Sequence, residues 1–292
     1  METVESVLKK AVKKLEEAGI DTPQLDAEVI LCTLLDVQRI KLHIYPEAEI
    51  SREICQMFWD NVEKRLQNMP VQYIIRHQEF MGLDFWVEEG ILIPRPDTEI
   101  LVGKVLDIYK EYYPGGHIRI MDMGVGSGAI SVSLAHFIKR AEIYAVDISS
   151  KALEVTSKNA KTHKVFDRIN LLQGDLFDSV KNEGLENTFH IIVSNPPYIP
   201  RDVIETLDKE IRNYEPAEAL DGGEDGLDFY REIIKKAPVY LKDKGWLLFE
   251  IGFDQALDIS NMMRDEGFIN VEIIKDLSGH DRVVLAQWVK NP

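Results

Sequence analysis

Short apolar runs and helical patterns alternate along the second part of the chain, and this alternation restricts the possible folds most. The apolar runs predict strands at Ile118–Asp122, Glu142–Val146, Ile169–Leu172, Phe189–Ser194, Trp246–Ile251, Asn270–Ile274 and Arg282–Trp288. Predicted helices begin at Ser127 and at Ser149 or Ser150, and others span Leu227–Leu241 and Asp254–Glu266. This order predicts an α/β domain with a mostly parallel, doubly wound sheet, whose ligands lie at the carboxyl ends of the strands. The last two strands are close enough in sequence to form an antiparallel hairpin.

The tetrapeptide Asn195-Pro196-Pro197-Tyr198 comes directly after one of these strands. Successive prolines have no backbone N–H and fix φ near about −65°, so the turn is stiff and its carbonyl groups stay available as acceptors. Asn195 adds one more carbonyl acceptor, and Tyr198 adds a flat ring. Such a turn suits a planar group that carries an NH2, either an amide or the exocyclic amine of a base. The alternative is a rigid turn without chemistry.

Glycines crowd the turn after the first predicted strand, in Asp122-Met123-Gly124-Val125-Gly126-Ser127-Gly128. Glycine permits a tight turn and a close backbone approach, and the helix that follows offers N–H groups at its N-terminus to an anionic part of a ligand. Because Ala129 comes next, the spacing also fits G-x-G-x-x-A. The loop alone therefore also allows a dinucleotide site.

Acidic residues end the next two strands of the predicted sheet. Asp147 lies where an acidic side chain bonds ribose hydroxyls in nucleotide-binding folds of this type. Asp175 is placed to reach an adenine amino group, with Leu176 against the ring. The structural alternatives are a helix cap at Asp147 and a loop turn at Asp175.

The first part of the chain has helical periodicity. Apolar residues at helical spacing predict a small helical bundle over residues 1–70, with Thr22-Pro23 and Ser51 at the starts of helices. Aromatic and β-prone residues interrupted by Gly82 and Gly90 predict a β-hairpin linker over 71–93, which leaves 94–292 for the α/β domain. The bundle is either a docking domain for a substrate or a stabilising appendage.

The segment Ile93-Pro94-Arg95-Pro96-Asp97-Thr98-Glu99 enters the α/β domain. Its prolines stiffen the chain, and Asp97 or Thr98 is expected to cap a helix over Glu99–Tyr112. Arg95 belongs either to a plain linker or to the mouth of an active site.

Composition limits the partners of the protein. A net charge of −16 and a pI near 4.9 argue against a surface devoted to a phosphate backbone. Apolar runs are too short to span a bilayer, and the chain is charged from Glu2 onward, so a cytoplasmic protein without a membrane partner is expected. Cys32 and Cys55 lack metal-like spacing and are expected to be reduced thiols, and no metal site is predicted.

A glycine-rich loop and two acids on three consecutive strand ends, with Asn-Pro-Pro-Tyr on the fourth, resemble the class I S-adenosylmethionine-dependent methyltransferases. Within that class the tetrapeptide belongs to enzymes that methylate adenine N6, some guanine N2 and glutamine N5. The resemblance implies S-adenosyl-L-methionine as cofactor, bound by Gly124, Val125, Gly126, Ser127, Gly128, Asp147, Asp175, Leu176 and Asn195. It also implies that Asn195, Pro196, Pro197 and Tyr198 bind the substrate, with Asn195, Pro196 and Tyr198 in the catalytic role.

Further motifs resemble those of the HemK/PrmC family, the glutamine N5-methyltransferases of peptide chain release factors. They are Pro70-Val71-Gln72-Tyr73-Ile74, Phe80-Met81-Gly82-Leu83, the Ile93–Glu99 segment, Glu215-Pro216, Ala219-Leu220-Asp221-Gly222-Gly223, Asp225-Gly226-Leu227 and Glu250-Ile251-Gly252. The resemblance reaches from the helical domain to Arg282 and implies a seven-stranded methyltransferase domain behind a helical bundle and a hairpin. The departures are Val125, Arg76 and His280, where the family commonly has Thr, Gly and Arg.

The family implies a release factor as partner, which presents a glutamine on a Gly-Gly-Gln loop. The main alternative is a methyltransferase for DNA or RNA base amines, which would need base flipping and a cationic groove. The acidic composition and the lack of a Lys/Arg-rich target domain disfavour it. A cofactor-binding module without catalysis and a nicotinamide-dependent oxidoreductase are further alternatives. The intact tetrapeptide disfavours the first, and a fourth-strand loop without hydride chemistry disfavours the second.

Overall fold

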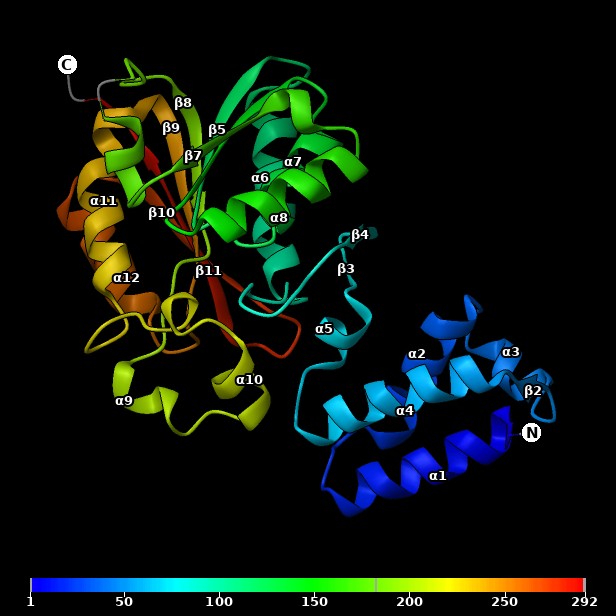
Figure 1. Ribbon diagram of the computed structural model, residues 1–292. Helices are drawn as coiled ribbons and strands as arrows, with labels where there is room; N and C mark the ends of the chain where they lie inside the picture. Colours follow the sequence, from blue (N-terminus) through cyan, green and yellow to red (C-terminus); the bar gives the residue numbers. More distant parts are fainter. Residues whose placement is uncertain (1, 182, 291–292) are drawn as a thin grey trace. The chain divides into compact units, whose positions relative to one another are not determined.

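The computed structural model describes residues 2–181 and 183–290, and the chain divides into two compact units (Figure 1). The first unit contains Met1–His77 together with Asp208–Tyr214. The second contains Gln78–Leu207 and Glu215–Pro292. A short segment from the second half of the sequence thus belongs with the N-terminal residues. Among the described residues no helix is long and apolar enough to cross a membrane.

The first unit is a helical bundle, as the sequence predicts. Its helices are α1 (Val4–Glu17), α2 (Pro23–Leu35), α3 (Ile40–Ile44), α4 (Arg52–Leu66), α5 (Val71–Ile75) and α10 (Lys209–Tyr214), and a two-residue pairing joins β1 (Glu2–Thr3) to β2 (Glu49–Ile50). The hydroxyls of Thr3 and Ser51 cap α1 and α4. The predicted β-hairpin linker over 71–93 is wrong at its start, because Val71–Ile75 form α5 and the first unit extends to His77.

A charged cluster lies inside this bundle. The Arg65 guanidinium on α4 donates to the Asp26 carboxylate on α2 at 2.6 Å, and both side chains are 4% exposed. Arg65 also pairs with Glu210 on α10. Because a buried charge without a partner costs several kcal/mol, these contacts hold α2, α4 and α10 in one arrangement.

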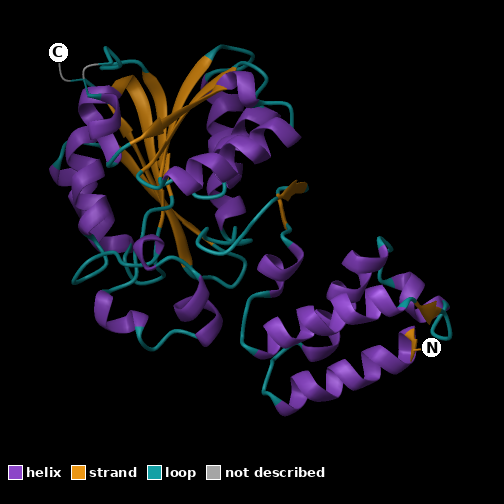
Figure 2. Ribbon diagram, viewed as in Figure 1, coloured by secondary structure: helices purple, strands orange, loops and turns teal. Residues whose placement is uncertain are grey.

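The second unit is a seven-stranded sheet between two layers of helices (Figures 1 and 2). The strand order is β10-β11-β9-β8-β5-β6-β7, for β5 (Ile118–Met123), β6 (Ala141–Asp147), β7 (Ile169–Gln173), β8 (Phe189–Ser194), β9 (Leu241–Glu250), β10 (Ile269–Lys275) and β11 (Asp281–Trp288). Only β11 runs antiparallel to its neighbours β9 and β10. The predicted doubly wound sheet and its terminal hairpin are therefore confirmed.

Helices α6 (Thr98–Tyr112), α7 (Ala129–Phe137) and α8 (Ser150–Thr162) cover one face of the sheet, and α11 (Asp228–Tyr240) and α12 (Ala256–Asp265) cover the other. The hairpin β3 (Gln78–Phe80) and β4 (Leu83–Phe85) precedes them, and short helical turns form α9 (Arg201–Ile204), η1 (Phe166–Arg168), η2 (Leu176–Val180) and η3 (Ala217–Ala219). Each face of the sheet has its own apolar core.

Three local expectations differ from the structure. Strand β9 begins at Leu241 rather than Trp246, and α7 begins at Ala129 rather than Ser127 because Gly128 adopts φ +83° before it. The side chain of Asp97 makes no cap bond at the start of α6. It instead lies 3.3 Å from the Arg282 guanidinium.

Candidate cofactor and substrate site

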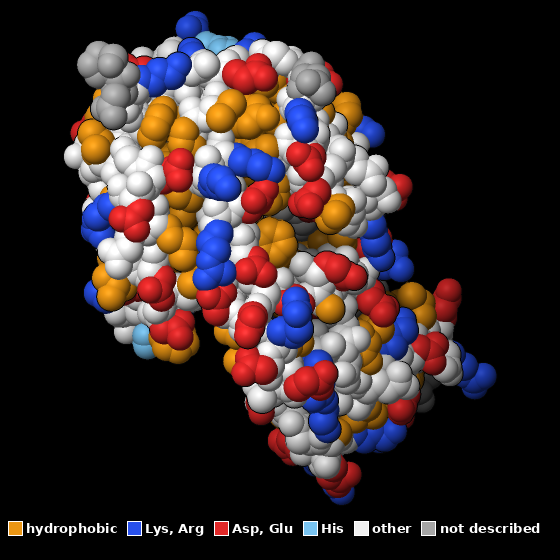
Figure 3. Space-filling view, turned by 90° about the vertical axis from the view of Figure 1, so that its left-hand side faces the viewer, with side chains coloured by type: hydrophobic (Ala, Val, Ile, Leu, Met, Phe, Trp, Pro, Cys, Tyr) orange, Lys and Arg blue, Asp and Glu red, His pale blue; other side chains and the backbone are white. Residues whose placement is uncertain are grey.

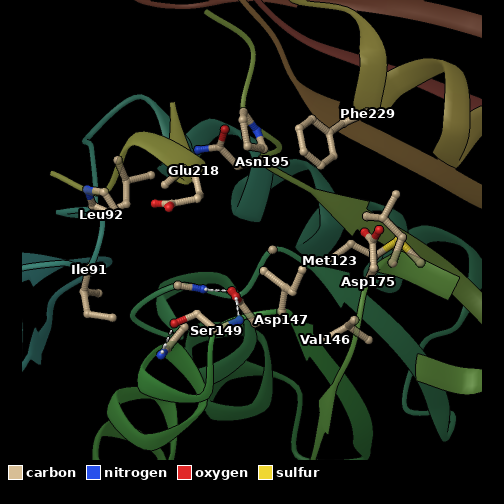
Figure 4. A pocket seen from close by; sticks show the side chains of 18 of the residues that line it. Ile91, Leu92, Met123, Val146, Asp147, Ser149, Asp175, Asn195, Glu218 and Phe229 are labelled. Atoms are coloured by element: carbon tan, nitrogen blue, oxygen red, sulfur yellow. Dashed lines mark hydrogen bonds between the residues drawn. The ribbon is translucent and has the colours of Figure 1, made fainter. Parts of the chain in front are cut away.

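The carboxyl ends of four parallel strands meet at one edge of the sheet. Met123 on β5 pairs with Val146 on β6 and with Ser194 on β8, while Asp147 pairs with Gln173 on β7. The loops that follow these strands therefore lie beside one another. They surround a cavity of about 440 Å³, within the range of small-molecule sites. Figure 4 shows Asp147, Asp175 and Asn195 around this space.

Asp147 connects the glycine loop to the start of α8. Its Oδ2 accepts a hydrogen bond from the Gly126 N–H, and its Oδ1 accepts one from the Ser149 N–H, both at 2.9 Å (Figure 4). Burial raises the pKa of this carboxyl, and the backbone hydrogen bonds oppose that rise. The side-chain cap of α8 comes from Ser149, so Asp147 is not the cap.

The glycine loop satisfies most of its own N–H groups. Gly124 and Val125 donate to the Val146 carbonyl at 2.9 and 3.1 Å, and Gly128 donates to the Val125 carbonyl. These loop N–H groups are therefore used within the protein, and the expectation of free N–H groups concerns the start of α7, which begins only at Ala129. Gly124 and Gly126 line the cavity with their backbone, whereas Val125, Ser127 and Gly128 are outside its lining.

Gly128 faces a helix rather than the cavity. It adopts φ +83°, and a Cβ atom there would lie 2.9 Å from Thr156 Cγ2 on α8. Only glycine fits both the backbone conformation and this close approach. Its place in the motif follows from packing between α7 and α8.

An acid and several apolar side chains line the cavity together. Asp175 and Leu176 line it, together with Ile148 and Phe229. Sequence reasoning missed Ile148 and Phe229. Ile148 directly follows Asp147, which is a usable signal, whereas Phe229 comes from α11 and has no local signal in the sequence.

The tetrapeptide is divided between cavity and core. Asn195 and Pro197 line the cavity, whereas Pro196 and Tyr198 are outside its lining. The Tyr198 carbonyl accepts from Gln255 Nε2 at 3.0 Å, and burial raises the pKa of its phenol to about 12. Within the described chain no donor bonds the Pro196 carbonyl, so the expected free acceptor is present.

Backbone contacts between the tetrapeptide region and the Gly222 loop support the tetrapeptide. Ile199 forms a backbone bridge with Asp221, in which the Gly222 N–H donates to the Ile199 carbonyl at 2.9 Å. A Cβ atom on Gly222 would lie 2.8 Å from Tyr198 Cα, so the two backbones are in direct contact. Arg95 pairs with the buried carboxylate of Glu215 at 2.5 Å. Arg95 is thus a support for this loop and is not part of the cavity lining.

Comparison with known proteins decides the family. Residues 6–75 match the model of the PrmC N-terminal domain, and residues 105–211 match that of the methyltransferase small domain. The release factor glutamine methyltransferase of Clostridium acetobutylicum is 41% identical over 283 residues, which cover 97% of this chain and 98% of that protein. The corresponding protein of Clostridium botulinum is 40% identical over 273 residues, or 94% and 95% of the two chains. The chain belongs to the release factor glutamine methyltransferase family.

A solved structure supports the fold of this release factor glutamine methyltransferase family member. The methyltransferase from Pyrococcus furiosus aligns with a TM-score of 0.53 at 16% identity, over 79% of this chain and 99% of that one. The predicted family, the enzyme class and the methyltransferase fold are confirmed. Membership also overturns the oxidoreductase and the non-catalytic module as alternatives.

The cavity of this methyltransferase fits S-adenosylmethionine, the cofactor of its family. The cofactor contains a ribose diol, an adenine with an amino group, and an apolar ring face. The cavity offers the Asp147 carboxylate, the Asp175 carboxylate, and the side chains of Ile148 and Leu176. The predicted cofactor is therefore confirmed, and the donor set of the cavity agrees with it.

Proposed function

We propose that this protein transfers the methyl group of S-adenosylmethionine to the side-chain nitrogen N5 of the glutamine in the Gly-Gly-Gln loop of peptide chain release factors. The observation that carries this proposal is the position of Asn195 and Pro197 on the wall of a cavity that also holds Asp147 and Asp175. Curated relatives named for this glutamine methylation support it over nearly the whole chain.

The cofactor is held by groups that already line the cavity. Asp147 would accept hydrogen bonds from the ribose hydroxyls, Asp175 would accept from the adenine amine, and Leu176 would pack on the ring. Gly124 and Gly126 admit the cofactor close to the backbone. Val125, Ser127 and Gly128 belong to the same loop but are outside the cavity lining, so they would support its conformation. When bound, the cofactor supplies an electrophilic methyl group on a sulfonium centre.

The tetrapeptide orients and polarises the amide nitrogen of the substrate glutamine, which is a poor nucleophile. An amide nitrogen reacts weakly because its lone pair is delocalised into the carbonyl. Asn195 Oδ1 and the Pro196 carbonyl each accept one N–H of the substrate amide, which orients the nitrogen and stabilises the positive charge that develops on it. The methyl–sulfur bond breaks as the new N–C bond forms, and only then does the substrate nitrogen become acidic enough to lose its proton to water, so no strong base is required at the start. Packing of the Tyr198 ring against the amide plane is a further part of the proposal.

The helical unit is proposed to dock a remote surface of the release factor. Binding energy from such a surface helps to position the reacting group. Deleting residues 1–70 is therefore expected to impair the use of the protein substrate more than cofactor binding. Loss of cofactor affinity instead would contradict this role. Because release factors act in translation, we propose the cytoplasm as the place of action.

Base-amine methylation is the second candidate, because adenine also presents a planar NH2. A nucleic acid substrate would require a cationic groove. The chain carries a net charge of −16, and Figure 3 shows Lys and Arg side chains interspersed with Asp and Glu over one face. These observations favour a protein substrate.

The test is transfer of a labelled methyl group to three substrates in parallel: a release factor, its Gln→Ala loop variant, and duplex DNA. Label is expected in the first alone. Asn195→Ala should lower the transfer rate by about 10²- to 10³-fold, as does the loss of one group aimed at developing charge. Cofactor affinity is measured separately by calorimetry. Equal label in the Gln→Ala variant, or unchanged turnover of Asn195→Ala, would refute the proposal.

A further inference from the structure

Three separated motifs of the sequence meet beside Asn195. Ser194 on β8 pairs with Phe249 on β9, so the residues that follow, Asn195 and Glu250, lie next to each other at the carboxyl edge of the sheet. Thr98 is the first residue of α6. The Asn195 Nδ2 donates to Thr98 Oγ1 at 3.3 Å. The Glu250 carboxyl lies close enough to Thr98 and Asn195 for both side chains to lower its pKa.

Glu250 is unusual for its burial. Its residue is 1% exposed, and its Oε2 has no hydrogen-bond partner among the described residues. A buried carboxyl with an unsatisfied oxygen destabilises a fold, and an apolar side chain of similar size would avoid that cost. The backbone of Glu250 is held separately, because its carbonyl accepts from the Tyr230 hydroxyl at 2.9 Å. Stability therefore does not account for the carboxyl group.

A carboxylate fixes which groups of its neighbours donate hydrogen bonds to it. It accepts hydrogen bonds and donates none, so it draws the Thr98 O–H and the Asn195 NH2 toward itself. The lone pairs of Thr98 Oγ1 then face the second N–H of Asn195. The two ends of an asparagine amide have nearly the same shape, and hydrogen-bond partners decide between the two orientations. With the NH2 end taken up inside the protein, the Oδ1 end faces the cavity.

We propose that Glu250, acting together with Thr98, is a positioning residue that fixes Asn195 with Nδ2 directed into the protein and Oδ1 directed toward the substrate nitrogen. This inference rests on the proposed function, in which Oδ1 accepts an N–H of the substrate amide. An inverted Asn195 would present its own NH2 to the substrate NH2 and would oppose binding. The inference also gives a role to the motifs around Thr98 and Glu250, which are outside the cavity lining.

The arrangement has a pH dependence. Burial raises the pKa of Glu250 to about 7, and it is opposed by the hydrogen bond from Thr98 and the charge of Arg282 on β11. The other ionisable groups facing Glu250 are Asp97 before α6, Tyr198 after β8 and Tyr230 on α11. Both tyrosines have raised pKa values, and so does Arg282, so these three keep their charge states near neutral pH. Protonated Glu250 becomes a donor and no longer enforces one orientation of Asn195.

The experiment compares Glu250→Gln, Glu250→Met, Thr98→Val and Thr98→Ser in the full-length enzyme. Single-turnover methyl transfer to a release factor is measured from pH 5.5 to 9 at saturating cofactor, with cofactor affinity and thermal unfolding measured in parallel. Glu250→Met and Thr98→Val should lower the rate about 10-fold at pH 8, the size expected for one lost hydrogen bond to a polar or charged group. Their cofactor dissociation constants should stay within about 2-fold, and Thr98→Ser should restore most of the rate.

The pH profile separates positioning from simple packing. The wild-type rate should rise as pH increases through about 7, and Glu250→Gln should remove this rise because it does not titrate. Glu142→Gln, a loss of one carboxylate on β6 away from the site, is the matched control and should keep the wild-type profile. A wild-type pH profile in Glu250→Gln, or a wild-type rate in Thr98→Val, would overturn the inference.

Failure of this inference is distinguishable from failure of the proposed function. If Asn195→Ala is inactive while Glu250→Met and Thr98→Val act like wild type, only the positioning role is refuted. If Asn195→Ala is fully active, the proposed function of the tetrapeptide fails first. If Glu250→Met does not fold, the inference is still tested by the rates of Thr98→Val and Thr98→Ser and by the pH dependence of the rate in Glu250→Gln.

Discussion

The Oδ2 of Asp147 accepts a hydrogen bond from the Gly126 N–H at 2.9 Å, so one side chain both closes the glycine loop and faces the cofactor cavity. The second oxygen accepts from the Ser149 N–H at the same distance. A ligand hydroxyl on this carboxylate would therefore meet an acceptor that the protein already holds in place. Affinity gained in this way needs little reordering of the site.

Asp147→Asn is expected to weaken S-adenosylmethionine binding by about 10- to 100-fold. The amide keeps one acceptor but loses the charge that strengthens hydrogen bonds to the ribose, a loss of about 1.5 to 3 kcal/mol. Calorimetric titration of the cofactor measures it. The rate at saturating cofactor should fall much less, because Asp147 is not in contact with the methyl acceptor. Glu142→Gln on the same strand should bind like wild type, and an equal loss there would contradict the role of Asp147.

Gly128→Ala and Gly126→Ala should separate packing from binding. At Gly128 the added Cβ meets Thr156 Cγ2 at 2.9 Å and φ is +83°, so the free energy of unfolding should fall by about 2 to 3 kcal/mol. At Gly126 φ is +55° and no atom lies within 4 Å, so the loss should be about 1 kcal/mol. Urea denaturation measures both.

Cofactor affinity should fall more in Gly126→Ala than in Gly128→Ala, which is the reverse of the order for the free energy of unfolding. Gly126 lines the cavity, so its new methyl group intrudes on the ligand, whereas Gly128 is outside the lining. Titration at a temperature where both variants are folded should show the larger loss of affinity for Gly126→Ala. The opposite order would mean that Gly128 contacts the cofactor directly.

The positions of Asp147, Asp175 and Asn195 were predictable because two local signals suffice. Apolar runs mark the strands, and parallel strands bring the residues after them to one edge of the sheet. The start of β9 was not predictable in this way. Lys242, Asp243 and Lys244 are polar, although Leu241 already pairs with Phe189 before an irregularity in the register.

Other parts of the site depend on contacts that leave no local trace. Phe229 reaches the cavity from α11, and Glu250 meets Thr98 only because β9 lies beside β8 and α6 begins nearby. The apolar or charged character of these residues is equally compatible with an ordinary core or surface. Likewise, α10 belongs with the helical unit, where Glu210 pairs with Arg65. The sequence of a six-residue polar helix does not indicate which element it packs against.

Asp122→Asn is expected to stabilise the protein at neutral and alkaline pH. Burial raises the pKa of Asp122 to about 7 from a usual value of 3.8, while the Ser131 hydroxyl bonds its Oδ2 at 2.6 Å and opposes the rise. Between pH 3.8 and about pH 7, Asp122 is therefore protonated in the folded state and deprotonated in the unfolded state. The free energy of unfolding falls as pH rises through this window, by at most about 4 kcal/mol. Below about pH 3.8 the group contributes nothing.

Thermal unfolding of wild type and Asp122→Asn from pH 4 to 8 measures this effect. The advantage of the variant should grow up to about pH 7 and then stay constant. Asp107→Asn, an exposed carboxylate beside Lys110, is the control and should show no such growth. A constant difference between wild type and Asp122→Asn across the whole range would contradict a raised pKa at this position.

Arg65→Ala is expected to destabilise the helical unit by about 3 to 5 kcal/mol. Its guanidinium is the partner of Asp26, and both side chains are 4% exposed, so the substitution leaves a buried carboxylate without compensation. Lys13→Ala removes an exposed pair with Glu17 at 3.7 Å and should cost at most about 0.5 kcal/mol. Hydrogen exchange resolved by segment measures both variants.

The exchange pattern tests whether α10 depends on the same arginine. Amides of α2, α4 and α10 should exchange faster in Arg65→Ala, because Glu210 on α10 loses its partner together with Asp26. The sheet strands β5 and β8 should keep their protection, since they belong to the other compact unit. Replacing both charges, Arg65→Met with Asp26→Leu, should restore protection in α2 and α4 but leave α10 exchanging fast, because Glu210 still lacks its partner. Recovery of all three helices in that double variant would mean that α10 is held by contacts other than the Arg65 ion pair.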